Sequence, residues 1–197
     1  MEKLAVRITG CLVRNNVALE KDQDIYVFGL IHLFSHSITL IVAVVLGIVL
    51  GILMEMTVFF AFLTAGRMSA GGYHASSFWK CIILSILTIL AAAITILYCP
   101  TPAQIPINVI SIIFSVIIVF SFAPVVNQKR PLSAIEVLRF RNRSRISCIV
   151  SALLICILVI FSHYVYSFSA ALGLGISTIS IMVALVQERL LNNISRP

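Results

Sequence analysis

The sequence predicts an all-α protein, a polytopic bundle of about six transmembrane helices that forms a single membrane domain over residues 1–197. Of its 197 residues, 60% are hydrophobic and only 11% are charged, and the mean hydropathy is +1.11. A soluble domain of this length cannot bury so much apolar surface, so the bilayer is the expected solvent. The net charge of +7 fits anionic lipid better than nucleic acid, because basic residues lie at the edges of the hydrophobic blocks.

The first 24 residues mix apolar and charged side chains and have no long apolar stretch like that of a signal peptide. Leu4, Ile8 and Leu12 recur near helical spacing among basic residues. This pattern predicts an N-terminal amphipathic helix lying on the cytoplasmic face of the membrane. A solvated leader that only sets the topology explains the same residues equally well.

Residues 25–66 are expected to form the first pair of helices. No Asp, Glu, Lys or Arg occurs between Ile25 and Met54, which is more than the roughly 20 residues that cross the apolar core. The apolar run after Glu55 is short. It completes a span only by taking in part of the polar stretch that follows it. The alternative to six spans is therefore four, with a re-entrant or interfacial segment in this region.

Two further helical hairpins are expected. Residues 82–123 carry no formal charge and are interrupted by a proline-rich turn, which predicts a pair of spans. Residues 146–187 form a second charge-free stretch, whose turn is expected near His163. A basic cytoplasmic linker, residues 124–145, separates the two hairpins.

The basic residues predict the orientation of the chain. With six crossings and the N-terminus inside, all 14 Lys and Arg residues fall on the cytoplasmic side. The polar tail, residues 188–197, is then cytoplasmic as well. This distribution is what the positive-inside rule requires.

A polar stretch with two glycines, residues 67–81, interrupts the hydrophobic blocks. It holds a candidate base and a candidate nucleophile, His74 and Cys81. Catalytic cysteines react as thiolates, and a neighbouring imidazole can move the proton during acyl transfer. On one straight helix these two residues would be about 10.5 Å apart along the axis. A direct pair therefore requires a break in the helix, and Gly71 and Gly72 favour a bend just before His74.

Other residues are weaker candidates for chemistry. The chain has five cysteines with no paired spacing, so a disulfide framework is not expected. His32 and His36 are four residues apart but have no acidic third ligand nearby, so no metal site is predicted. Gly173 and Gly175 follow no strand and suit close helix packing better than a nucleotide loop.

Two motifs resemble the AgrB family, the multi-spanning membrane cysteine endopeptidases that process the AgrD propeptide into a cyclic autoinducing peptide. The first motif matches at five positions: Arg67, Gly71, Gly72, His74 and Cys81. The second, residues 123–132 with the sequence APVVNQKRPL, resembles the family's Ala-Pro…Asn…Lys-Pro-Leu segment. The resemblance covers most of the chain, including the order and length of its hydrophobic blocks.

The resemblance implies a quorum-sensing thiol protease in which Cys81 is the nucleophile and His74 its general base and acid. Cys81 would cleave off the C-terminal part of the propeptide and hold the rest as a thioester. An internal thiol or hydroxyl of the substrate would then close a thiolactone or lactone ring. The resemblance implies no cofactor, an AgrD-like propeptide as partner, and an active site at the cytoplasmic face of the bacterial cell membrane. A homodimer is expected for so small a membrane enzyme.

The remaining motif residues have two explanations each. Arg67 would hold a propeptide carboxylate or fix the loop, or else anchor a helix end. Gly72 would give a bend or backbone access, or else only close packing. Lys129 and Arg130 would bind the acidic tail of an AgrD-type propeptide, or else form a basic loop that sets topology.

Two alternative functions do not involve catalysis: a small multi-pass peptide exporter and a membrane adaptor. The thiol discriminates between these functions. An exporter or adaptor should tolerate Cys81→Ser, whereas a thiol peptidase should not.

Overall fold

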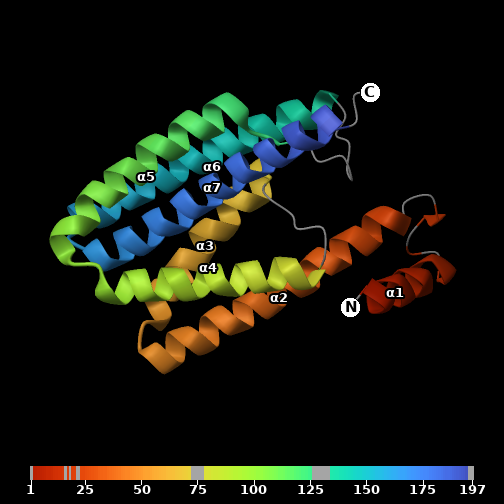
Figure 1. Ribbon diagram of the computed structural model, residues 1–197, viewed down its shortest axis with the longest axis horizontal. Helices are drawn as coiled ribbons and strands as arrows, with labels where there is room; N and C mark the ends of the chain where they lie inside the picture. Colours follow the sequence, from red (N-terminus) through yellow and green to blue (C-terminus); the bar gives the residue numbers. More distant parts are fainter. Residues whose placement is uncertain are drawn as a thin grey trace. The chain divides into compact units, whose positions relative to one another are not determined.

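The computed structural model describes residues 2–15, 17, 19–20, 23–71, 78–125 and 134–194. In these ranges the chain forms seven α-helices and no strand (Figure 1). The helices are α1 (Glu2–Arg14), α2 (Gln23–Leu50), α3 (Leu53–Ala70), α4 (Phe78–Tyr98), α5 (Thr101–Phe122), α6 (Ala134–Ile160) and α7 (Tyr164–Ile194). Their contacts divide the chain into two units, Met1–Ala43 with Ala75–Leu90, and Val44–His74 with Ala91–Pro197.

Five of these helices are long and apolar enough to cross a bilayer. They are α2, α4, α5, α6 and α7. The shortest of them, α4, has 21 residues, which gives a length of about 32 Å against an apolar core of about 30 Å. The prediction of an all-α, multi-spanning bundle is therefore confirmed.

Helix α3 is the element for which the sequence did not decide between a full transmembrane helix and a re-entrant or interfacial segment. It continues through Arg67 to Ala70, so the short apolar run does take in the start of the polar stretch. Its 18 residues extend about 27 Å, slightly less than the apolar core. It carries Glu55 in its first turn and Arg67 in its last, and it is not one of the five apolar helices named above.

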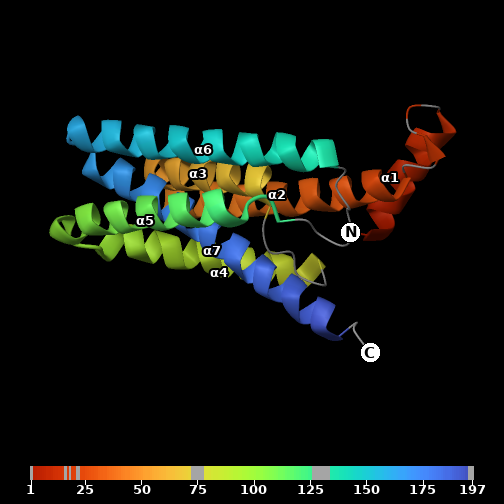
Figure 2. The same ribbon diagram turned by 90° about the horizontal axis from the view of Figure 1, so that it is seen from above.

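In the second unit, α3, α5, α6 and α7 run side by side, as the two views agree (Figures 1 and 2). Helix α7 contacts each of the other three, and its Phe168, Ala171 and Leu174 are at most 2% exposed. On α3, the side chains of Met56 and Phe59 are equally buried. The core of this unit therefore lies around α7 and α3.

Helices α3 and α7 approach each other most closely at Gly173. A Cβ atom built on Gly173 would meet the carbonyl oxygen of Phe59 and would lie 2.9 Å from the backbone nitrogen of Leu63. A Cβ on Gly175 would lie 3.2 Å from Oγ of Ser111 on α5. The prediction that these two glycines serve helix packing is confirmed.

Side-chain hydrogen bonds join α5 to α7 inside the same unit. Nδ2 of Asn108 donates to Oγ of Ser167 at 2.9 Å. The hydroxyls of Thr178 and Ser115 share a hydrogen bond at 2.8 Å. All four side chains are at most 2% exposed. Because lipid offers no hydrogen-bonding partner, such pairs hold transmembrane helices together.

We expect Asn108→Ala to lower the free energy of unfolding of the protein in bicelles by about 1 kcal/mol, the usual scale of an interhelical hydrogen bond in a membrane. A denaturant titration of the purified protein measures this change. Asn142→Ala on α6 is the matched control, because Asn142 is exposed. Equal unfolding midpoints for the two variants would show that the Asn108–Ser167 bond contributes no stability.

The ends of the helices follow local sequence signals. Helix α2 ends before Gly51, which has a φ of 70°. Pro100 precedes α5 in an extended conformation, as the proline-rich turn predicted. The turn between α6 and α7 ends at His163, also as predicted. Helix α6 already begins at Ala134, so the basic segment 124–145 is helical from that residue on, and four of its arginines lie on the helix: Arg139, Arg141, Arg143 and Arg145.

The first unit contains α1, α2 as far as Ala43 and α4 as far as Leu90. The predicted N-terminal helix is present as α1, but it ends at Arg14, and the last residues of the predicted range 1–24 already belong to α2. Ala5 and Thr9 are fully buried, and Leu4 and Val6 are about half exposed. One side of α1 is therefore covered within the unit, and apolar side chains remain exposed on the helix.

Candidate active site

The structure describes three of the seven predicted site residues. Arg67 lies in the last turn of α3, Gly71 follows that helix, and Cys81 lies in the first turn of α4. The other four, Gly72, His74, Lys129 and Arg130, lie outside the described residues. The pairing of His74 with Cys81 therefore stays a prediction.

Gly71 ends α3 in a conformation that only glycine adopts readily. Its φ is 79° and its ψ is −172°, and its N–H donates to the carbonyl of Arg67 at 3.1 Å. L-residues with a side chain rarely occupy this region of φ and ψ. A Cβ at Gly71 would also lie 3.1 Å from the carbonyl oxygen of Val125. Both the turn and the close approach therefore require glycine here.

The two sequence motifs meet at this point. The backbone N–H of Val125 donates to the carbonyl of Ala70 at 3.1 Å. Ala70 and Gly71 belong to the first motif, and Val125 belongs to the second, more than fifty positions later in the chain. Ala123, which opens the second motif, is 5% exposed. The beginning of the second motif is thus fixed against the end of α3 within one unit.

Arg145 of α6 holds the adjoining end of α5. Its Nη2 donates to the carbonyl of Phe120 at 3.1 Å, and its guanidinium carbon lies 5.1 Å from the centre of the Phe120 ring. A cation at a helix C-terminus satisfies a carbonyl that has no partner within the helix. The sequence identified Arg145 only as one charge of a basic segment, because the distance to Phe120 depends on how α5 and α6 pack.

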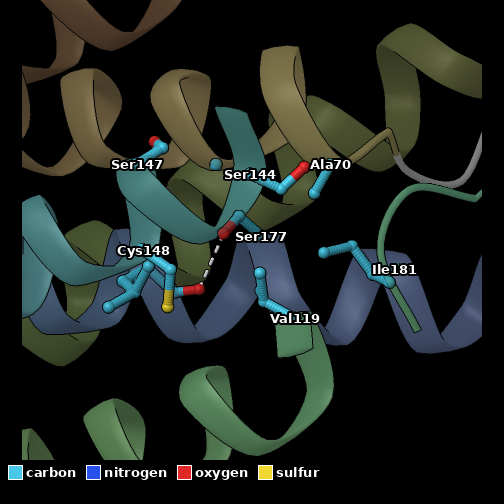
Figure 3. Close-up of a pocket in the computed structure, with 9 residues that line it drawn as sticks. Ala70, Val119, Ser144, Ser147, Cys148, Ser177 and Ile181 are labelled. Carbon is cyan, nitrogen blue, oxygen red and sulfur yellow. Dashed lines mark hydrogen bonds between the residues drawn. The ribbon is translucent and has the colours of Figure 1, made fainter. Parts of the chain in front are cut away.

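A small cavity lies in the same unit between α3, α5, α6 and α7 (Figure 3). It has room for about one water molecule. Its polar lining consists of the Ser144, Ser147 and Ser177 hydroxyls and the Cys148 thiol. The three hydroxyls already donate to backbone carbonyls of Phe140, Ala65 and Leu174. The cavity is too small for a peptide and therefore forms part of the packing of the bundle.

Cys81 lies in the other unit, on the fourth residue of α4. Its side chain is partly buried, and Lys80 next to it is exposed. The first turn of a helix has N–H groups without partners inside the helix, and they point toward its N-terminal end. Phe78 and Trp79 begin the helix with their rings edge to face, 5.7 Å apart. Among the described residues, Cys81 thus occupies a helix start with partial access to its surroundings.

The sulfur of Cys81 has a partner that the sequence did not reveal. The hydroxyl of Ser35 on α2 donates to Sγ of Cys81 at an Oγ–Sγ distance of 3.9 Å. Both residues belong to the first unit, and Ser35 is 8% exposed. Ser35 stands between His32 and His36 on the same helix. Over the ranges that the structure describes, no group of three metal-binding side chains forms there or elsewhere.

The fold and the site are those of a multi-pass membrane protein with a cysteine at the start of one apolar helix. The sequence profile of accessory gene regulator B, AgrB, matches residues 5–182. The chain therefore belongs to the AgrB family. Membership connects it with quorum sensing and implies an AgrD-type propeptide as its partner. Neither a curated protein nor a solved structure matches the chain.

Proposed function

We propose that this protein is a cysteine endopeptidase of the bacterial cell membrane that cleaves an AgrD-type propeptide, with Cys81 as the nucleophile. The observation that carries the proposal is that the AgrB profile spans the whole first motif, including Cys81 and His74. The position of Cys81 supports it, because its partly buried thiol lies in the first turn of a helix. None of the other four cysteines belongs to either motif.

The chemistry is acyl transfer in two steps. The imidazole of His74 takes the Cys81 proton, and the thiolate attacks the scissile carbonyl carbon of the propeptide. The carbon–nitrogen bond breaks, the leaving amine receives the proton from His74, and the acyl group stays on sulfur as a thioester. A thiol or hydroxyl within the substrate then attacks that thioester and closes the ring. Cys81 leaves as a thiolate and regains a proton.

The second step needs positioning more than it needs driving force. Exchange of one thioester for another is nearly neutral in free energy. Hydrolysis of the thioester would instead release a linear product and prevent ring closure. A site at the boundary of the lipid limits access of water to the intermediate. The start of an apolar helix is a suitable place for such a site, and Ile82, the residue after Cys81, is 5% exposed.

The other motif residues have supporting roles in this proposal. Arg67, at the end of α3, orients the segment that leads to His74, and Gly71 and Gly72 give that segment its turn. Lys129 and Arg130 bind the acidic tail of the propeptide. The distribution of basic residues supports an active site and both termini at the cytoplasmic face. We further propose that the enzyme is a homodimer.

The experiment is mass spectrometry on proteoliposomes that contain this protein and its AgrD-type propeptide. We expect the wild type to release a C-terminal fragment and to carry an acyl adduct on Cys81. Cys81→Ala and His74→Ala should release no detectable fragment, because each lacks one partner of the proton transfer. Cys156→Ala is the matched control, since Cys156 is an exposed cysteine of α6 outside both motifs.

The decisive variant is Cys81→Ala. If it cleaves the propeptide as fast as the wild type, the proposed catalytic role is wrong. An exporter or an adaptor would then be the better account of the protein. An adduct on Cys156 with none on Cys81 would also contradict the assignment.

A further inference from the structure

The nucleophile that we propose is in contact with a side chain outside both motifs. We propose that Ser35 is a positioning residue for Cys81: its hydroxyl holds the sulfur in place and stabilises the thiolate by donating a hydrogen bond to it. The proposal rests on the catalytic role proposed for Cys81.

The pair forms a long O–H···S hydrogen bond. Oγ of Ser35 lies 3.9 Å from Sγ of Cys81 and donates to it. The two residues are on different helices, α2 and α4, but within one unit of the structure. A hydrogen bond to a neutral thiol is weak, and it strengthens when the acceptor becomes an anion. The contact therefore matters most in the steps in which the sulfur carries negative charge.

The neighbouring hydroxyls of α2 behave differently. The hydroxyl of Ser37 donates to the carbonyl of Leu33 at 2.9 Å, and the hydroxyl of Thr39 donates to the carbonyl of Ser35 at 3.0 Å. These are ordinary bonds of a hydroxyl to its own helix. The Ser35 hydroxyl is instead directed to another helix, and the residue is buried while Ser37 is exposed.

The same contact predicts which chemical step depends on Ser35. In the ring-closing step, Cys81 is the leaving group and departs as a thiolate. A hydrogen bond to the departing sulfur lowers the energy of the thiolate, and a more stable leaving group departs faster. The Ser35 hydroxyl should therefore shorten the lifetime of the thioester on Cys81, in addition to orienting the sulfur for the first attack.

The test compares Ser35→Val, Ser35→Thr and Ser37→Ala with the wild type in proteoliposomes. Valine and threonine have the same shape, and only threonine keeps a hydroxyl. We expect Ser35→Val to lengthen the lifetime of the Cys81 acyl adduct about tenfold, as the loss of a hydrogen bond to a charged group implies. Ser35→Thr should stay within about threefold of the wild type, and Ser37→Ala, on the exposed side of α2, should match it.

A second readout does not require the propeptide. The rate at which iodoacetamide alkylates Cys81 in a Cys11/Cys99/Cys148/Cys156→Ala background should fall about tenfold in Ser35→Val and recover in Ser35→Thr. Equal adduct lifetimes and equal alkylation rates in Ser35→Val and Ser37→Ala would overturn the role of Ser35. If Cys81→Ala still cleaves while Ser35→Val slows alkylation, the contact is real and the proposed catalytic function is what fails.

Discussion

Replacing Gly173 with valine should unfold or fail to assemble the bundle of α3, α5, α6 and α7. Even the first side-chain atom at this position would meet backbone atoms of α3, at Phe59 and Leu63. Backbone cannot rotate away as a side chain can, so the two helices would have to separate along their contact. Overpacking of this kind costs about 3 kcal/mol or more when the neighbour cannot move. The core around Phe59 and Leu174 would open as the helices part.

The measurement is the amount of monodisperse protein after detergent extraction, followed by its unfolding midpoint. Gly175→Ala is the control, two residues further along the same helix. A Cβ there faces the Ser111 side chain at 3.2 Å, and that side chain can adjust its rotamer. We expect Gly175→Ala to be recovered at close to the wild-type level. A normal yield and midpoint for Gly173→Val would show that α3 and α7 do not pack at this distance.

Replacing Gly71 with alanine should abolish most propeptide cleavage while the bundle still folds. The residue combines a φ of 79° with a close approach to the carbonyl of Val125. A side chain in this conformation costs about 1–3 kcal/mol, which the chain can avoid by changing the path of the segment after α3. That segment leads to His74, so we expect the cleavage rate to fall at least about tenfold for a shift of this size.

Gly51→Ala is the matched control for this prediction. Gly51 has a similar φ of 70° and lies at the other end of α3, where a Cβ would meet no atom within 4 Å. The two variants should have similar unfolding midpoints, and only Gly71→Ala should lose cleavage in the propeptide assay. Equal cleavage rates would mean that the turn at Gly71 does not position the residues that follow it.

Much of the fold could be predicted from the sequence because hydrophobic length is a local property. The charge-free runs predicted α2, α4 and α5 to within a few residues, and the prolines near residue 100 predicted the turn before α5. The last charge-free run ends at Gln187, but α7 continues through most of the predicted polar tail to Ile194. The beginning of α6 could not be predicted in this way. Its first turns carry several arginines, and a helix end outside the apolar run has no hydrophobic signal.

Only some residues of the candidate site could be predicted from the sequence. The motif residues could be selected from the sequence, since His74 and Cys81 have both the required chemistry and a family pattern. Ser35 could not, because it is one polar residue of an apolar helix and its distance from Cys81 depends on tertiary packing. The hydrogen bond between Val125 and Ala70 could not be predicted either, although each residue lies in a recognisable motif. A backbone hydrogen bond between distant segments leaves no trace in residue type.

The position of α3 has a consequence for how the protein is made. Its packing partners are α6 and α7, which are synthesised after it, and α7 is the last helix of the chain. Until α7 emerges from the ribosome, the apolar side chains of Val58 and Phe62 lack Ala170, Ala171 and Leu174, the residues of α7 against which they finally pack. Helix α3, with a charge near each end, thus depends for its stable placement on a segment more than a hundred residues downstream. Chains that terminate before α7 should accordingly be the ones that membrane proteases remove.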